Sequence, residues 1–380
     1  MKIVSACIYI LNIPFVESFG HNLYERNHCD SIIVKLTGDC GASGFGEGVP
    51  RPYVTGETKE ESVEYIRSKL LPGIIGEDLS GADTCSALTF VDRLLPAQDA
   101  SDPVAWNASR SAVELAAIDC LLRSRKASLN VILPSESQEV TYSGVITSGS
   151  IETVEKIARR CVAAGIETIK LKVCKAGDVE VVSTVRDIVG NTASIRLDAN
   201  SAFNPDTVLP FLSSVSKYDI ECIEQPIPRG NPTDLAKIRS ASPIRVMADE
   251  SVVSIRDAVE LIEKKAVDYF NLRISKCGGL HNTLEIAELA GSAGIGIQLG
   301  CQVGETAILS AAGRHAAAHL EDLRFVEGSF GTHLLVEDIA QEDLVFGLGG
   351  YAPVLTDPGL GITVQEEILD KYAQTTIPVC

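Results

Sequence analysis

Aromatic residues, paired cysteines and long apolar runs are scarce in this sequence, and each shortage narrows the class of protein. Aromatic residues make up 5% of the 380 residues, whereas alanine and β-branched residues are plentiful, as in α/β proteins. The eleven cysteines form no Cys-x-x-Cys pair, so we interpret them as reduced thiols of a cytoplasmic protein. No apolar run is long enough to span a membrane, and the N-terminal stretch lacks the cleavage pattern of a signal peptide.

Basic residues are also in short supply, and nucleotide-binding motifs are absent. Lysine and arginine number 33 against 51 acidic residues, and the net charge of −18 argues against binding of nucleic acid. Neither Gly-x-x-x-x-Gly-Lys-Ser/Thr nor Gly-x-Ser-x-Gly occurs. The glycines at 41–48 and 347–350 are interpreted as turn formers. His315 and His319, which have no acid between them, are interpreted as ordinary helix residues.

The first 125 residues predict an α+β domain, because strand patterns are followed by helical ones. The apolar stripe over 105–125, for example, recurs at helical spacing. We expect strands at 1–11 and 31–37 around a polar loop at 14–30, and helices at 59–71, 83–95 and 105–125.

From residue 138 onward, short apolar strands alternate with amphipathic helices on a repeat of roughly 25 residues. Eight strands, each followed by a helix, predict an α/β fold of the (β/α)8 type, a modified TIM barrel; a doubly wound open sheet is the alternative. We therefore expect a capping domain at 1–125, a barrel at 126–350, and a segment at 351–380 that returns to the capping domain. The predicted barrel strands are 140–148, 166–174, 193–200, 221–226, 244–251, 267–278, 295–301 and 323–330.

Charged residues recur at the predicted ends of five consecutive barrel strands. In a barrel these ends form the mouth, where active sites lie. An acid at one strand end is often only a helix cap, and a Lys-x-Lys strand is often an exposed face. Neither explanation accounts for five residues at successive spacings of 26, 26, 25 and 27. These residues are Lys172, Asp198, Glu224, Asp249 and Lys276.

The residue types at these positions indicate enolate chemistry. Three adjacent carboxylates repel one another unless a cation bridges them, and oxygen ligands without histidine or cysteine suit Mg²⁺ or Mn²⁺. Lys170 and Lys172 are two residues apart in a strand, so both side chains point to the same face. Beside a metal ion we expect lysine pKa values to fall toward those of a general base. The sequence therefore predicts removal of a proton α to a carboxylate, with the metal stabilising the enolate.

The motifs around these residues resemble the enolase superfamily, and within it the muconate lactonizing enzyme subgroup, over essentially the whole chain. They are Lys-x-Lys at 170–172, Asp-x-Asn at 198–200, Glu-Gln-Pro at 224–226, Asp-Glu-Ser at 249–251 and the lysine before Cys-Gly-Gly at 277–279. The resemblance implies that the three strand-end carboxylates bind Mg²⁺ and that Asn200 and Glu250 support them. It also implies that Lys172 and Lys276 act as acid and base on opposite faces of the substrate, with Lys170 supporting Lys172.

Members of this subgroup differ in substrate, and the motifs above do not include the residues that determine substrate specificity. Dipeptide epimerases carry Asp-x-Asp at the end of the eighth strand, where this sequence has Gly328-Ser329-Phe330, with Glu327 one residue earlier. In the capping loops, basic residues are candidates for contact with an anionic or polar distal group. The candidate substrate-binding residues are His21, Tyr24, Arg26, Arg51, Tyr53, Arg273, Cys301, Glu327 and Ser329.

Three functions remain open at this point. The leading hypothesis is a racemase or epimerase of an amino-acid-derived carboxylate that uses two lysines. The second is a cycloisomerase or a β-eliminating dehydratase that uses one lysine as base. The third is a barrel that binds metal without catalysis. We expect a small carboxylate as the partner, no nucleic acid and no membrane, and a homo-oligomer, as is common in relatives of this type.

Overall fold

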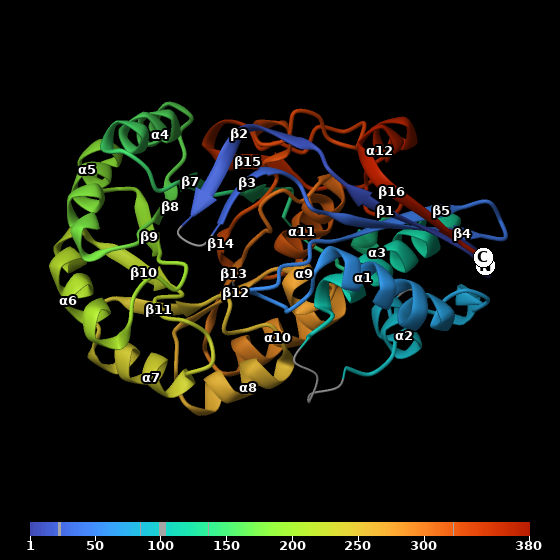
Figure 1. Cartoon of the computed structure of the whole chain (residues 1–380), viewed down its shortest axis with the longest axis horizontal. Coiled ribbons are helices and arrows are strands. Elements are labelled where there is room, and N and C mark those ends of the chain that lie inside the picture. The colour runs from blue at the N-terminus through green and yellow to red at the C-terminus, as the bar shows by residue number, and fades with distance from the viewer. Residues whose placement is uncertain (22–23, 84, 99–103, 136, 322) are drawn as a thin grey trace.

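The computed structural model describes residues 1–21, 24–83, 85–98, 104–135, 137–321 and 323–380, without the side chains of residues 18–25. A curled sheet of parallel strands with helices around it forms one part of the molecule, and an antiparallel sheet with its own helices lies beside it (Figure 1). No helix among these residues is long and apolar enough to cross a membrane.

The antiparallel sheet belongs to the capping domain and joins the two ends of the chain. Its strand order is β16-β1-β4-β5, and β1 pairs along its length with both β16 and β4. In Figure 1, β16 in red runs beside β1 in blue. The predicted return of the C-terminal segment is confirmed in this pairing. The four strands are β1 (Ile3–Leu11), β4 (Ile32–Gly38), β5 (Ser43–Gly48) and β16 (Ala373–Val379).

Glycines in β5 allow the long helix α3 (Asn107–Ser124) to lie directly on the strand. A Cβ atom built at Gly46 would lie 2.0 Å from Ala112 O, and one built at Gly48 would lie 2.0 Å from Ala108 O. Successive even-numbered positions of a strand share one face, so the sequence Gly-Phe-Gly-Glu-Gly presents a bare backbone to the helix. The interpretation of these glycines as turn formers is wrong.

A hairpin replaces the polar loop that was expected at 14–30. Strands β2 (Pro14–His21) and β3 (Tyr24–His28) pair antiparallel. β2 also bonds to the chain that follows the last barrel strand, where Val16 N donates to Leu334 O at 2.8 Å. The polar sequence misled because the hairpin is held by backbone hydrogen bonds to a distant segment and by one buried side chain, Phe15.

The capping domain has helical structure at each of the three predicted places, and only the segment expected at 83–95 is clearly shorter. The segment expected at 59–71 is α1 (Lys59–Tyr65) followed by one wide turn at Ile66–Leu70, and the segment expected at 83–95 is α2 (Ala87–Leu94). Thr58 is the N-cap of α1 and forms a capping box with Glu61. The Thr58 side chain accepts a hydrogen bond from Glu61 N, and the Glu61 side chain accepts one from Thr58 N. A last helix, α12 (Glu366–Tyr372), precedes β16.

Eight parallel strands form the barrel in the order of the sequence, which confirms the predicted fold class. The curl of the sheet brings its two outer strands together, since Ser143 N donates to Val326 O at 2.8 Å. The strands are β7 (Gly144–Ile146), β8 (Thr168–Lys172), β9 (Ser194–Asp198), β10 (Ile220–Glu224), β11 (Arg245–Ala248), β12 (Tyr269–Leu272), β13 (Gly296–Leu299) and β14 (Leu323–Val326).

Helices follow the first seven of these strands, and several begin at a side chain that caps them. Ser150, Asn204, Asn231 and Ser254 each accept a hydrogen bond from the first turn of the helix they precede. The helices are α4 (Ile151–Ala163), α5 (Val179–Val189), α6 (Pro205–Val215), α7 (Pro232–Ala241), α8 (Ile255–Glu263), the short α9 (Ile274–Cys277) with α10 (Leu280–Ser292), and α11 (Ala307–His319).

The eighth strand departs from the predicted repeat, because no α-helix follows β14 directly in the described part of the chain. In its place β6 (Glu139–Thr141) pairs with β15 (Tyr351–Pro353). Val140, Tyr142, Val326 and Ala352 form a small buried apolar cluster there. A pair of short strands thus covers the place where the first and last barrel strands meet.

Two buried carboxylates of the capping domain dock it onto the barrel. Glu47 of β5 accepts hydrogen bonds from Thr306 N and Leu309 N, at the start of α11. Glu114 of α3 accepts from Leu280 N at 2.5 Å, at the start of α10. The first N–H groups of a helix have no partner within it, so these carboxylates satisfy donors that the barrel leaves open.

Candidate active site

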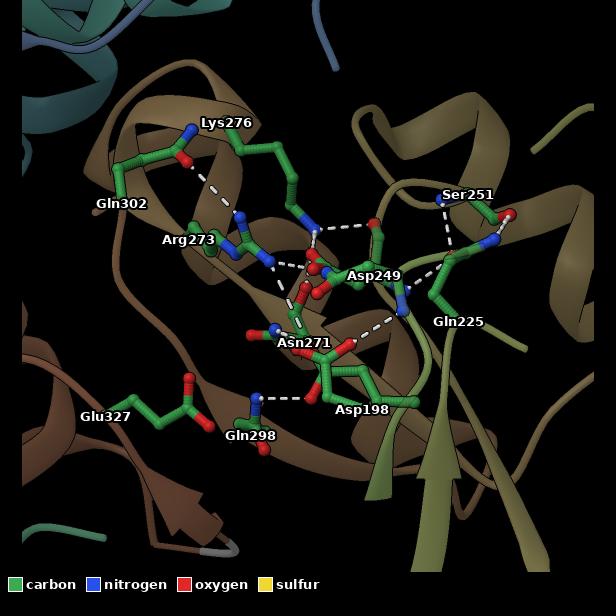
Figure 2. A network of polar contacts seen from close by, with 12 residues as sticks. Asp198, Gln225, Asp249, Ser251, Asn271, Arg273, Lys276, Gln298, Gln302 and Glu327 are labelled. Carbon is green, nitrogen blue, oxygen red and sulfur yellow. Dashed lines mark hydrogen bonds and ion pairs between the residues drawn. The ribbon is translucent and has the colours of Figure 1, made fainter. Parts of the chain in front are cut away.

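The polar residues predicted at the strand ends lie together at one rim of the barrel. Lys172, Asp198 and Glu224 end β8, β9 and β10, and adjacent members of this series are aligned in the sheet. Asp249 directly follows β11. The regular spacing in the sequence therefore becomes an arc of side chains, part of which is seen in Figure 2.

The three carboxylates of this arc are withdrawn from water. Asp198 is 1% exposed, and Glu224 and Asp249 are fully buried, so they need positive partners. Lys170 is one such partner: its Nζ lies 3.0 Å from Asp198 Oδ2 and 2.9 Å from Glu224 Oε1. Burial alone would lower the pKa of Lys170, but these carboxylates and Glu327 raise it above its ordinary value. Lys170 is accordingly a fixed cation.

Lys172 points the same way but reaches the open cavity at the barrel mouth. Its Nζ donates to Asn200 Oδ1 at 2.6 Å and lies 3.3 Å from Asp198 Oδ2. Asn200 has a positive φ of 40°, and its backbone N–H donates to Asp198 Oδ1 at 3.0 Å. Lys170 lines the same cavity, so the Lys-x-Lys strand directs both ammonium groups to the barrel mouth, the first enclosed by Asp198, Glu224 and Glu327.

Lys276, predicted to act on the opposite face of the substrate from Lys172, contacts Asp249 in this structure. It sits in the short helix α9, is fully buried, and is not among the residues that line the cavity. Its Nζ lies 2.7 Å from Asp249 O, 2.9 Å from Asp249 Oδ1 and 2.6 Å from Asn271 O (Figure 2). Burial lowers the pKa of Lys276 to about 7. β12 ends at Leu272, four residues before Lys276.

Arg273 takes the strand-end position of β12. Its guanidinium forms an ion pair with Asp249, lies 3.9 Å from Glu224 Oε1, and donates to Gln302 Oε1 at 3.2 Å (Figure 2). The side chain is 13% exposed and lines the cavity. Arg273 was predicted only as a substrate-binding candidate, yet it occupies the fifth place of the arc.

Amides that the sequence analysis did not single out hold the carboxylates in place. Asn271 Nδ2 donates to Glu224 Oε1 at 2.8 Å, and Gln298 Nε2 donates to Glu224 Oε2 at 3.2 Å. Gln225 Oε1 accepts from the backbone N–H groups of Asp249 at 2.9 Å and Ser251 at 3.1 Å (Figure 2). Asn271 and Gln298 stand as single polar residues inside apolar strands, and that contrast is the signal that identifies them.

Below the arc, Glu327 connects two cations across the barrel. One oxygen lies 3.2 Å from Lys170 Nζ and the other forms a short ion pair with Arg196. Arg196 is fully buried, with its guanidinium carbon 4.6 Å from the centre of the Phe325 ring. Glu327 lines the cavity, as expected of a substrate contact, but both its oxygens already have cationic partners.

A cavity of about 210 Å³ lies between the arc and the capping domain. At its capping end, Arg51 Nη1 lies 3.1 Å from Asp30 Oδ2, and Arg26 pairs with the same oxygen. Two guanidinium groups thus contact one carboxylate and line this end of the cavity. The remaining residues that line the cavity include Tyr53, Val145, Glu250, Cys301, Val303, Phe330, His333 and Leu334.

Of the other predicted substrate contacts, Cys301 lines the cavity and Ser329 does not. Burial raises the pKa of the Cys301 thiol well above the ordinary value. Ser329 Oγ accepts from Arg314 Nη2 at 3.0 Å. His21 and Tyr24 belong to the hairpin strands, but their side chains lie outside the description.

Comparison with known proteins places the chain in a family. Residues 152–368, more than half of the chain, match the family model described as Enolase C-terminal domain-like. The chain belongs to the enolase superfamily. The resemblance drawn from the sequence motifs is thereby confirmed.

Three members of the enolase superfamily show which known enzymes this chain resembles. The hydrophobic dipeptide epimerase of Enterococcus faecalis is 30% identical over 84% of this chain and 87% of its own. The structure of N-succinyl Arg/Lys racemase from Bacillus cereus has a TM-score of 0.89 at 27% identity, over 100% of both chains. Muconate lactonizing enzyme from Pseudomonas putida has a TM-score of 0.86 at 25% identity, over 98% of this chain and 100% of its own.

The strand-end carboxylates of this enolase superfamily member form an all-oxygen donor set, which suits Mg²⁺. Beside them Glu250 Oε2 is buried and, among the described residues, has no hydrogen-bond partner; burial and then the charge of Asp198 raise the pKa of Glu250 to about 7. No three acidic, histidine or cysteine side chains described here are grouped so that they could hold a metal ion, and Lys170 and Arg273 contact the carboxylates instead. The donor set of Asp198, Glu224 and Asp249 fits a divalent cation. The solved Enterococcus faecalis epimerase is complexed with Mg and a dipeptide.

Proposed function

We propose that the chain is a Mg²⁺-dependent isomerase that removes the proton α to a carboxylate and racemises or epimerises an amino-acid-derived substrate. The observation that carries the proposal is Lys172, whose ammonium group reaches the cavity beside three buried carboxylates. The names of the relatives, an epimerase and a racemase among them, support the same reaction.

Asp198, Glu224 and Asp249 would hold the Mg²⁺. When bound, the ion supplies positive charge next to the carboxylate oxygens on which negative charge develops. Lys172, in its neutral form, takes the α-proton, and the electron pair of the C–H bond moves into the enolate. Lys170 keeps its charge among the carboxylates and adds to the positive field at the same place.

The charges around the cavity indicate which substrates fit. Glu327 lies at the end of the eighth strand, and its oxygens are paired with Lys170 and Arg196, so it offers no spare charge to a substrate ammonium group. At the other end of the cavity, Arg26 and Arg51 both line the wall, so two guanidinium groups face that part of a substrate. We therefore propose an amino acid whose nitrogen is acylated, with a neutral or anionic acyl group, in preference to a free dipeptide.

A second candidate is a cycloisomerase, or a dehydratase that eliminates a β-substituent from the same enolate. The position of Lys276 favours it: Lys276 does not line the cavity, and Lys170, which does, is paired with Asp198 and Glu224, so that Lys172 would act as the single base. The likeness to muconate lactonizing enzyme supports this candidate as well.

Deuterium exchange tests the proposal. The protein is incubated in D₂O with Mg²⁺ and a pool of N-succinyl amino acids, N-acetyl amino acids, dipeptides and hydroxy acids, and deuterium at the α-carbon is measured by mass spectrometry. Lys172→Ala should lower the exchange rate by about 10²–10⁴-fold, the usual range for loss of a general base. Lys156→Ala, at an exposed position of α4, serves as the control. Equal exchange in Lys172→Ala and wild type would contradict the role of Lys172.

Several sequence predictions remain untested proposals. They are the domain limits at 125/126 and 350/351, use of Mn²⁺ in place of Mg²⁺, a cytoplasmic location and a homo-oligomeric state. Size-exclusion chromatography with light scattering measures the last of these directly.

A further inference from the structure

We propose that His333 is a specificity-determining residue that donates a hydrogen bond to a carboxylate at the far end of the substrate's acyl group. The inference rests on the proposed function, because it names the acyl group that the same site selects. It concerns the part of the cavity beside the capping domain and leaves proton transfer at the α-carbon to Lys172.

His333 reaches the cavity wall from the segment that follows the last barrel strand. After β14 the chain forms one turn of 3-10 helix at Gly331–His333. Both His333 and Leu334 line the cavity. The backbone of the same segment is bonded to β2 of the capping domain, where Val16 N donates to Leu334 O at 2.8 Å. The place of His333 at the junction of barrel and capping domain is therefore fixed by backbone hydrogen bonds.

An aromatic contact orients the imidazole ring. Its centre lies 6.2 Å from that of Phe346, with the two planes at 87°. Phe330, which also lines the cavity, meets the same Phe346 ring edge-on at 6.1 Å. Edge-to-face contacts of this kind are favourable for aromatic rings. Phe346 thus supports both side chains in the cavity wall.

The imidazole of His333 has polar groups that the protein leaves unused. The side chain is exposed, and it makes no hydrogen bond or ion pair with any residue that the structure describes. By contrast, both ring nitrogens of His315 face oxygen atoms, at 2.7 Å and 3.1 Å. Neutral or protonated, an imidazole has at least one N–H to donate. His333 can therefore donate to a ligand in the cavity without losing a partner in the protein.

Arg51 and His333 border neighbouring parts of the cavity. Arg51 Nη2 donates to Val303 O at 2.8 Å, on the loop that follows β13. His333 lies on the loop that follows β14, and β13 and β14 are adjacent in the sheet. Both loops therefore meet the capping domain on the same side of the barrel mouth, where Arg26 also lines the wall.

The charges along the cavity wall favour a carboxylate at this end. The acids that line the cavity in the described part of the chain all belong to the barrel, and they are Asp198, Glu250 and Glu327. A carboxylate on the capping side meets guanidinium and imidazole donors instead, and hydrogen bonds to an ionised group are the stronger ones. Acyl groups derived from dicarboxylic acids carry such a carboxylate at their far end, whereas acetyl and fatty acyl groups do not.

The test compares two substrates of the same shape. They are the N-succinyl and N-isocaproyl derivatives of the amino acid whose N-acyl forms exchange fastest in the deuterium pool, and a pair of methyl groups in the second replaces the carboxylate oxygens of the first. In wild type we expect kcat/KM for α-deuterium exchange to favour the N-succinyl derivative by at least about tenfold.

Substitutions of His333 separate its hydrogen bond from its packing. His333→Phe keeps a ring beside Phe346 and removes the donor, so the preference should fall about tenfold, through KM rather than kcat. His333→Asn keeps an N–H donor and should retain most of the preference. Thr332→Phe puts the same ring at the exposed neighbouring position, which does not line the cavity, and should leave the preference unchanged.

The outcomes separate this inference from the proposed function. A preference that His333→Phe leaves unchanged, or that Thr332→Phe or His333→Asn abolishes equally, overturns the inference while exchange itself upholds the proposed function. Equal kcat/KM for the two derivatives in wild type also overturns the inference alone. Exchange in no member of the pool overturns the proposed function and the inference with it.

Discussion

Replacement of Glu114 by glutamine tests how a buried carboxyl group behaves at the start of a helix. Glu114 is 1% exposed and accepts hydrogen bonds from Leu280 N and His281 N, and these bonds favour its charged form. Burial outweighs them and raises the pKa of Glu114 from 4.5 to about 7. A difference of about 2.5 pKa units corresponds to about 3 kcal/mol.

The sign follows from which state holds the proton more tightly. Because the pKa of Glu114 is higher in the folded protein, its contribution to stability is fully present below about pH 4.5 and is lost as the pH rises through about 7. Glutamine stays neutral at every pH. Between pH 4.5 and 8, the free energy of unfolding of Glu114→Gln should therefore rise relative to wild type by about 3 kcal/mol.

Urea unfolding of both proteins at several pH values measures this difference. The control is Glu60→Gln, at an exposed position of α1, for which the difference should stay within about 0.5 kcal/mol. If the difference for Glu114→Gln is constant with pH, or moves toward wild type, the reasoning is refuted. The N–H groups at the start of α10 would then stabilise the charged carboxylate more than burial disfavours it.

Three further predictions concern the capping domain, the buried ion pairs and the metal. Gly46→Ala should lower the free energy of unfolding by at least about 2 kcal/mol, since its Cβ would lie 2.0 Å from the backbone oxygen of Ala112; an unchanged urea midpoint would contradict the close contact. Glu327→Gln leaves Lys170 and Arg196 with one carboxylate fewer and should cost about 3–5 kcal/mol in thermal unfolding; a neutral change would contradict the pairing. EDTA should abolish α-deuterium exchange and added Mg²⁺ restore it, with circular dichroism unchanged; exchange that survives EDTA argues against a metal ion.

Much of the barrel was predictable because its strands are buried and repeat at nearly constant length. Their ends carry Lys172, Asp198 and Glu224 in register, so counting residues was enough to group these side chains. At Lys276 the spacing continues although the strand has already ended at Leu272, and the lysine reaches Asp249 from the short helix α9. A spacing rule follows the repeat, whereas the direction of a side chain depends on where extended backbone becomes helix.

Features fixed by contact between distant segments were not predictable from the local pattern. The hairpin of β2 and β3 lies in a largely polar stretch of sequence, and its neighbour Leu334 is about 300 residues away in the chain. The partners of Glu327 likewise come from β8 and β9, on another side of the barrel. Such charges look available in the sequence, and only the folded arrangement shows that they are neutralised.

The pairing of β1 with β16 has a consequence for the order of synthesis and folding. Ala6 lies opposite Val379, so the partner of the first strand leaves the ribosome after the whole barrel has been made. The barrel can begin to fold while β1 still lacks that neighbour, and contacts of such long range form slowly. We expect the cover of the cavity to be completed last, and no single cut in the chain would release barrel and capping domain as two intact pieces.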